Sequence, residues 1–313
     1  MLPSFPHRKW YEQRINTMDE LEQYVLNAHF PEAAYFRGMP NSDFICISSF
    51  YRQYLLNNKD SLKWQYQQVG HGVTMSLPKI DKSKYKEHSF EILDYFYACL
   101  RELGSKELSF NSITYLAQHY GLPTNLIDFS ANPKVSLFFA CHDEDEKFSD
   151  KDCTLYMSDI LWHVKSMMPS NQTMKMGHFK HPTENRLLTD AEADDLMFNM
   201  FTTIDKEQSV TVTPKIKLEE VKYSARIRNQ EGVFVYHCDH VPFDRIMHTS
   251  KCNDGINKVF VINKELKPKI LDELNSKYKI NKKYVYPDVD EDPNAEIIET
   301  AVKKTKEKFD LPV

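Results

Sequence analysis

The stretch AQHYGLPTNLIDF, at residues 117–129, decides much of the fold. It predicts the end of a helix, a corner at Gly121 and Pro123, a short apolar strand and then the carboxylate of Asp128. Only 8 of the 313 residues are glycine, well below the average share of roughly 7%. A chain that avoids glycine and still places one here is expected to need its backbone freedom. Gly121 is therefore predicted to end the helix.

Helices and strands are predicted on both sides of this stretch. Thr17 and Glu20 fit a capping box that starts a helix over 17–30, Asn111 or Ser112 caps a helix over 111–120, and Asn132 with Pro133 starts the next one. Further helices are predicted at 50–69, 87–103, 135–141, 186–201, 264–277 and 294–308, strands at 33–38, 126–129, 232–237 and 259–262, alternation at 210–212 and 223–227, and a loop at 72–86. The pattern predicts an α+β fold, with helices mainly in the N-terminal half and strands in the C-terminal half.

Composition excludes several classes of protein. The net charge is −5, so the chain lacks the strongly basic character of many nucleic-acid-binding domains, although a local basic groove stays open. The six cysteines are scattered without a C-x-x-C pair and are expected to be reduced and buried. The start has no signal-peptide pattern, and no apolar run reaches the ~20 residues of a membrane span. We expect a cytoplasmic protein that does not contact the membrane.

Two polar positions next to predicted strands are candidates for ligand binding. Arg37 ends an apolar strand beside Gly38, where its planar guanidinium could hold a phosphate or carboxylate while the glycine lets a ligand approach the backbone. A structural salt bridge is the alternative. Asp128 could bind a ligand hydroxyl or orient Arg37, and it could equally organise its loop by accepting backbone N–H groups.

Other polar clusters carry weaker signals. His119 is predicted to lie off the apolar face near the end of its helix, where the helix dipole favours a positive charge. Residues 237–240 read His-Cys-Asp-His and 288–292 are acidic, but neither spacing matches a common zinc or calcium site, so no metal is expected. The glycine-rich and nucleophile motifs of common nucleotide-binding proteins and hydrolases are absent from the sequence.

Three separated blocks resemble the FRG-domain family, named for its Phe-Arg-Gly motif. The first is YFRG at 35–38, continued by SSFYR at 48–52, which carries a second arginine. The second is QHYGLPTNLIDFS at 118–130 with Pro133 and FFA at 138–140, and the third is R-I-x-x-Q-x-G-x-F at 226–234. Residues 286–290 also resemble the family's ending. Asn125 and Phe129 depart from the pattern, where the family usually has arginine and tryptophan.

The order of these motifs is similar to that of ADP-ribosyltransferases. The resemblance implies a mixed-sheet core of that kind and NAD as a substrate. It implies Arg37, Gln230 and Glu231 as catalytic residues, with NAD held by Arg37, Gly38, Arg52, His119, Tyr120, Thr124, Asp128 and Ser130. It also implies transfer of ADP-ribose to a protein or nucleic-acid acceptor, or NAD hydrolysis, in a toxin or phage-defence effector with a possible antitoxin or regulatory partner.

Two other functions stay open at this point. The same Arg37 and Asp128 pocket could recognise a nucleotide or nucleic acid without catalysis, since Gln230 cannot supply the negative charge of a glutamate. A structural adaptor would instead bury these polar groups in a network.

The enzyme hypothesis makes a structural prediction. Arg37, Asp128 and Gln230 should converge on one cleft within a single domain spanning 1–313. That domain would comprise a motif-bearing half at 17–145, a variable insertion at 150–222 and C-terminal strands with a helix at 223–300. Gly38, Gly121 and Gly232 are expected to be backbone hinges around the cleft.

Overall fold

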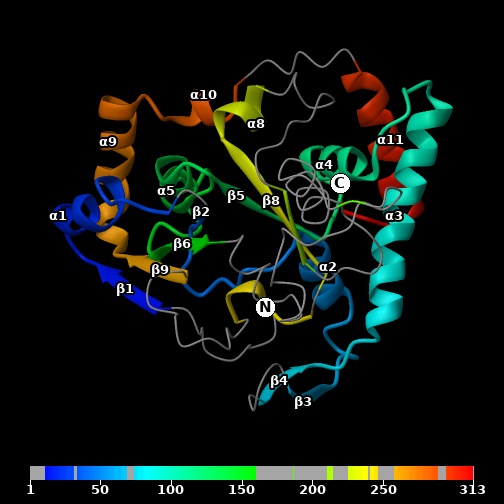
Figure 1. Cartoon of the computed structure of the whole chain (residues 1–313), viewed down its shortest axis with the longest axis horizontal. Coiled ribbons are helices and arrows are strands. Elements are labelled where there is room, and N and C mark those ends of the chain that lie inside the picture. The colour runs from blue at the N-terminus through cyan, green and yellow to red at the C-terminus, as the bar shows by residue number, and fades with distance from the viewer. Residues whose placement is uncertain are drawn as a thin grey trace.

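A computed structural model describes residues 11–31, 34–68, 74–159, 186, 210–213, 225–238, 240–245, 257–287 and 294–312. Its central feature is a seven-stranded sheet with strand order β1-β9-β6-β2-β5-β8-β7 (Figure 1). The strands are β1 (Tyr11–Ile15), β2 (Ala34–Met39), β5 (Leu126–Ser130), β6 (Cys153–Asp159), β7 (Val210–Thr213), β8 (Gly232–His237) and β9 (Asn257–Ile262). β1 pairs with β9 in parallel, and the other described pairings are antiparallel. The sheet is therefore mixed.

Helices from both halves of the chain cover this sheet, which confirms the α+β class (Figure 1). The expected separation of helices and strands between the two halves is wrong, because β1, β2 and β5 come from the N-terminal half. α5 (Pro133–Cys141) and α9 (Lys267–Tyr278) pack on the part formed by β1, β9, β6 and β2. α2 (Ser49–Asn57), α3 (Lys82–Glu102) and α4 (Phe110–His119) share a core with β5 and β8, and α11 (Ala295–Lys308) lies along α3. The remaining elements are α1 (Met18–Leu21), η1 (Glu22–Leu26), α8 (Ala225–Asn229), η3 (Phe243–Arg245), η4 (Lys264–Leu266), α10 (Lys282–Val285) and a separate hairpin of β3 (Trp64–Gln68) and β4 (Thr74–Pro78).

Strands β2 and β5 are joined at a single ladder position, where Phe36 lies opposite Ser130. On its other side β2 pairs with β6 along its whole length, from Ala34 to Met39. We call this point the β2–β5 junction. It divides the sheet into a part with β1, β9, β6 and β2 and a part with β5, β8 and β7.

Local sequence signals predicted several element ends correctly. Thr17 and Glu20 form the expected capping box. Asn132 caps α5 by accepting a hydrogen bond from the N–H of Lys134, with proline in the first turn. Gly121 follows the end of α4 with φ +79°, a conformation that glycine adopts without steric cost.

Other predictions of local structure are wrong. Ser109 caps α4 in place of Asn111 or Ser112. The alternation at 223–227 does not give a strand, because 225–229 form helix α8. The segments predicted as a helix at 50–69 and a loop at 72–86 contain β3 and β4, which pair with each other. The sequence analysis also missed β1 and β6, and β6 places part of the 150–222 range at the centre of the sheet.

Several predictions lie outside the described residues. They concern most of 160–224, together with Asp239, Cys252 and 288–292. The five cysteines within the described ranges are buried and form no disulfide, as expected: Cys46, Cys99, Cys141, Cys153 and Cys238. None of the described helices combines the length and hydropathy that a bilayer crossing requires.

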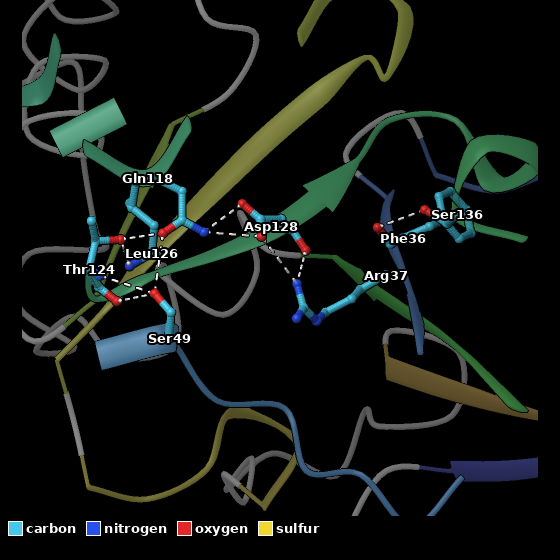
Figure 2. Close-up of polar contacts among 8 residues, drawn as sticks. All are labelled: Phe36, Arg37, Ser49, Gln118, Thr124, Leu126, Asp128 and Ser136. Atoms are coloured by element: carbon cyan, nitrogen blue, oxygen red, sulfur yellow. Dashed lines mark hydrogen bonds and ion pairs between the residues drawn. The ribbon is translucent and has the colours of Figure 1, made fainter. Parts of the chain in front are cut away.

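Helix α5 approaches strand β2 so closely that only glycine fits at position 38. A Cβ atom on Gly38 would lie 1.8 Å from the carbonyl oxygen of Ser136 and 2.6 Å from the backbone nitrogen of Ala140. The Ser136 hydroxyl donates a hydrogen bond of 3.0 Å to the carbonyl of Phe36 and links helix to strand (Figure 2). Gly38 therefore serves close packing behind the β2–β5 junction.

We expect Gly38→Ala to lower the free energy of unfolding by about 3 kcal/mol, because backbone atoms of α5 would have to move. Gly232→Ala is the matched control, since its Cβ would meet its nearest atom at an ordinary 3.5 Å. It should change stability by no more than about 1 kcal/mol. Urea unfolding followed by circular dichroism measures both. Equal losses in the two variants would contradict this account of Gly38.

A buried polar network connects α2, α3 and β5 beneath the sheet. The Tyr85 hydroxyl donates to Oδ1 of Asn125 at 2.7 Å, and the Ser48 hydroxyl donates to the same atom at 3.3 Å. Asn125 is 2% exposed, and its Nδ2 donates to Sγ of Cys238 at 3.4 Å. Burial raises the pKa of Tyr85 well above its usual value. Asn125, one of the departures from the family pattern, is therefore a core residue here.

The pKa of Tyr85 predicts a pH dependence of stability. In the unfolded chain a tyrosine titrates near pH 10. Because folding raises the pKa, the contribution of Tyr85 is complete below about pH 10 and is lost as the pH rises further. At pH 7, Tyr85→Phe should lower the free energy of unfolding by about 1 kcal/mol through the lost hydrogen bond. Above pH 10 the stability of this variant should fall less steeply than that of wild type, because the variant has no hydroxyl to titrate at this position. Urea unfolding across this range tests it, with the exposed Tyr66→Phe as control. Parallel pH curves for Tyr85→Phe and wild type would contradict it.

Candidate functional site

A cleft of about 340 Å³ opens at the β2–β5 junction. Arg37 lines it from β2, Asp128 from β5, and Gln230 from the turn that precedes β8. The predicted convergence of these three residues is confirmed, although they are widely separated in sequence. The cleft also has an aromatic lining: Phe36, Phe129, Phe139, Phe234 and Tyr286.

Arg37 bridges the two strands that separate at the junction. Its Nη1 donates a hydrogen bond of 2.6 Å to the carbonyl oxygen of Asp128, and lies 3.8 Å from the Asp128 carboxylate (Figure 2). The side chain is 16% exposed, and its buried Nε has no hydrogen-bond partner in the described part of the chain. The structural interpretation of Arg37 is therefore confirmed, and its binding of an anion stays a prediction.

The Asp128 carboxylate is held in place by Gln118. Nε2 of Gln118 donates to both carboxylate oxygens, at 3.0 and 3.1 Å, so Asp128 is gripped from α4 on one side and faced by Arg37 on the other (Figure 2). The Asp128 side chain remains 55% exposed. The carboxylate is therefore oriented but still open to a ligand.

Gln118 is in turn oriented by a buried threonine. The Thr124 hydroxyl donates to Oε1 of Gln118 at 2.6 Å and accepts from the N–H of Leu126 at 3.1 Å. Ser49 adds a contact by accepting from the N–H of Thr124 at 3.0 Å. Thr124 is 1% exposed and does not line the cleft. Its position makes it a positioning residue for Gln118 and, through it, for Asp128.

The opposite side of the cleft is fixed by hydrogen bonds to main-chain carbonyls. The Ser130 hydroxyl donates to the carbonyl of Gln230 at 2.7 Å. Nε2 of Gln230 donates to the carbonyl of Val285 at 3.0 Å, which ties α8 to α10. The guanidinium of Arg226 lies over the ring of Tyr286, 4.9 Å from its centroid. Burial raises the pKa of Tyr286, whereas the Arg226 charge lowers it.

Glu231 points away from this arrangement. It has φ +46°, and its carboxylate accepts a hydrogen bond of 2.7 Å from Nδ2 of Asn132 at the start of α5. It is exposed and does not line the cleft. The expected hinge at Gly232 is wrong, because the left-handed conformation falls on Glu231 instead.

The remaining predicted residues are distributed around the cleft. Gly38, His119 and Ser130 line it, whereas Tyr120 does not. Arg52 lines a neighbouring cavity. Desolvation lowers the pKa of Arg52, and the positive charge of Arg37 lowers it further, while the Asp128 carboxylate raises it. These electrostatic effects connect Arg52 to the cleft.

Sequence reasoning missed the roles of Gln118, Arg226 and Tyr286. Gln118 and Arg226 belong to two of the blocks that resemble the family. Their spacing alone does not predict that Gln118 holds the Asp128 carboxylate or that Arg226 lies over the ring of Tyr286. Across the described ranges, no group of three or more His, Cys, Asp or Glu side chains could hold a metal ion.

Comparison with known proteins identifies one domain. Residues 32–149 match the family model of the FRG domain. This span includes the YFRG and QHYGLPTNLIDFS blocks and ends before Gln230. No curated protein and no solved structure matches the chain. The chain therefore carries an FRG domain over residues 32–149.

Proposed function

We propose that the cleft binds NAD as a substrate and transfers its ADP-ribose to a macromolecular acceptor. The convergence of Arg37, Asp128 and Gln230 on one cleft is the observation that carries this proposal. It agrees with the motif order of ADP-ribosyltransferases, in which an early arginine, a central polar motif and a late strand supply the site. Fold analogy alone is not a mechanism, so the proposal rests on the chemistry of the cleft.

The charge and the aromatic lining of the cleft support a dinucleotide as the ligand. Arg37 and Arg226 place two cations in it, and neither guanidinium forms a close carboxylate pair among the described residues, the nearest being Arg37 to Asp128 at 3.8 Å. Guanidinium groups suit phosphate oxygens because their donors lie in a planar fork. The aromatic lining offers faces and edges to planar rings. We assign the diphosphate to Arg37.

Asp128 is the carboxylate that this cleft presents. In the proposed reaction the bond between nicotinamide and ribose breaks, and its electron pair leaves with neutral nicotinamide. The ribose passes through an oxocarbenium-like state, which a fixed carboxylate stabilises electrostatically. The acceptor nucleophile then bonds to the ribose carbon and releases its proton to water. Gln118 keeps Asp128 in place for this step, and Gln230 acts by positioning the α8–α10 side.

A recognition module without catalysis is the alternative. Gln230 supplies no negative charge, and Glu231 is bonded to Asn132 outside the cleft. In that case Arg37 and Asp128 would bind a nucleotide and release it unchanged. The biological setting, a cytoplasmic toxin or phage-defence effector held by an antitoxin, remains a prediction from the family resemblance.

Incubation with NAD, followed by chromatography of released nicotinamide, tests the enzyme proposal. Wild type should release nicotinamide, alone or with cell extract as a source of acceptor. Arg37→Ala and Asp128→Asn should each slow release at least about tenfold, equivalent to about 1.4 kcal/mol in the barrier. Arg101→Ala, which changes an exposed arginine on α3, should behave as wild type.

The outcomes separate the hypotheses. No release from wild type under either condition rules out the enzyme, and NAD binding without turnover in calorimetry would then favour the recognition module. Equal turnover in wild type, Arg37→Ala and Asp128→Asn would mean that the reaction occurs elsewhere. Circular dichroism should show that each variant is folded, because Arg37 also contacts the β5 backbone.

A further inference from the structure

A second cavity, of about 270 Å³, adjoins the cleft. Gln118 lines both, so the two cavities share this residue as a boundary. Ser49, Arg52 and Gln53 supply the polar side of the second cavity, and Pro123 and Pro312 lie on its apolar side. It contains no acidic side chain among its lining residues.

Among the described residues, Arg52 is the one charged group that lines this cavity, and no acidic side chain lines it. Its backbone N–H bonds to Ser48, but its guanidinium has no hydrogen bond or ion pair with any described residue. Desolvation and the Arg37 charge both lower its pKa, yet an arginine remains protonated at neutral pH. Arg52 is exposed, so its guanidinium is open at the mouth of the cavity and can pair with an anion from outside the chain.

The cavity lies next to the proposed reaction centre. Asp128 is close enough to act electrostatically on Arg52, and Gln118, which holds Asp128, forms the shared boundary. A ligand in the second cavity would therefore lie beside Gln118, within electrostatic reach of both Arg37 and Asp128. A strand bound there could extend past Gln118 and present an acceptor to a ribose held in the cleft.

We infer that the Arg52 cavity binds a phosphate group of a nucleic-acid strand, which is the acceptor for the proposed transfer. The inference rests on the proposed function for the acceptor role, but the binding site can be tested alone. Arginine, serine and glutamine are among the side chains that contact phosphates in nucleic-acid complexes. The apolar side at Pro123 and Pro312 would meet the sugar and base.

Fluorescence anisotropy with a labelled single-stranded oligonucleotide, in the absence of NAD, tests this inference. We expect Arg52→Gln to weaken binding about tenfold and to reduce the slope of log affinity against log salt by about 0.7, the value for one lost phosphate contact on a single strand. Lys59→Gln is the matched control, because it removes a positive charge from the exposed segment that follows α2. It should change the affinity by less than about twofold.

Four results would overturn the inference. The first is no oligonucleotide binding by wild type, and the second is an equal effect of Arg52→Gln and Lys59→Gln. The third is a loss with Arg37→Ala as large as with Arg52→Gln, which would place the strand in the main cleft. The fourth is Arg52-dependent binding of an acidic peptide or of NAD instead of the oligonucleotide. Since no NAD is present in the main assay, failure of NAD turnover and failure of this site are separate results.

Discussion

The hydrogen bond from Arg37 to the carbonyl of Asp128 is the contact on which the site depends. It crosses the β2–β5 junction, where the two strands share only the pair of Phe36 with Ser130. Because β2 and β5 pair at one position only, the two strands leave room for a cleft between them. Arg37 spans this space with a hydrogen bond and does not fill it. The same side chain thus holds the two parts of the sheet together and supplies positive charge to the opening between them.

Packing and positioning residues determine how the side chains of this cleft are arranged. Gly38 lets α5 lie directly behind β2, and Thr124 orients Gln118, which orients Asp128. On the other side, Gln230 holds the backbone of Val285. The polar side chains of the cleft are therefore preorganised by a network of hydrogen bonds, the arrangement that electrostatic catalysis or selective binding requires.

The sequence predicted the features that depend on neighbouring residues. The helix end at Gly121, the strand after it and the cap at Asn132 follow from spacing and backbone preference over a few positions. Features that depend on distant contacts were not predictable in this way. Helix α8 replaces the expected strand because its last turn is bonded to α10, and Glu231 turns outward because its backbone adopts a positive φ before β8. Motif order predicted the convergence on one cleft but not which side chains face it.

The parallel pairing of β1 with β9 has a consequence for how the protein is made. Tyr11 lies opposite Lys258, so β1 cannot pair until β9, far along the sequence, has been made. Long-range pairing of this kind slows folding, and domains made on the ribosome fold as their segments emerge. The cleft also needs Tyr286 from α10. A nascent chain would therefore carry an incomplete site until α10 has been made.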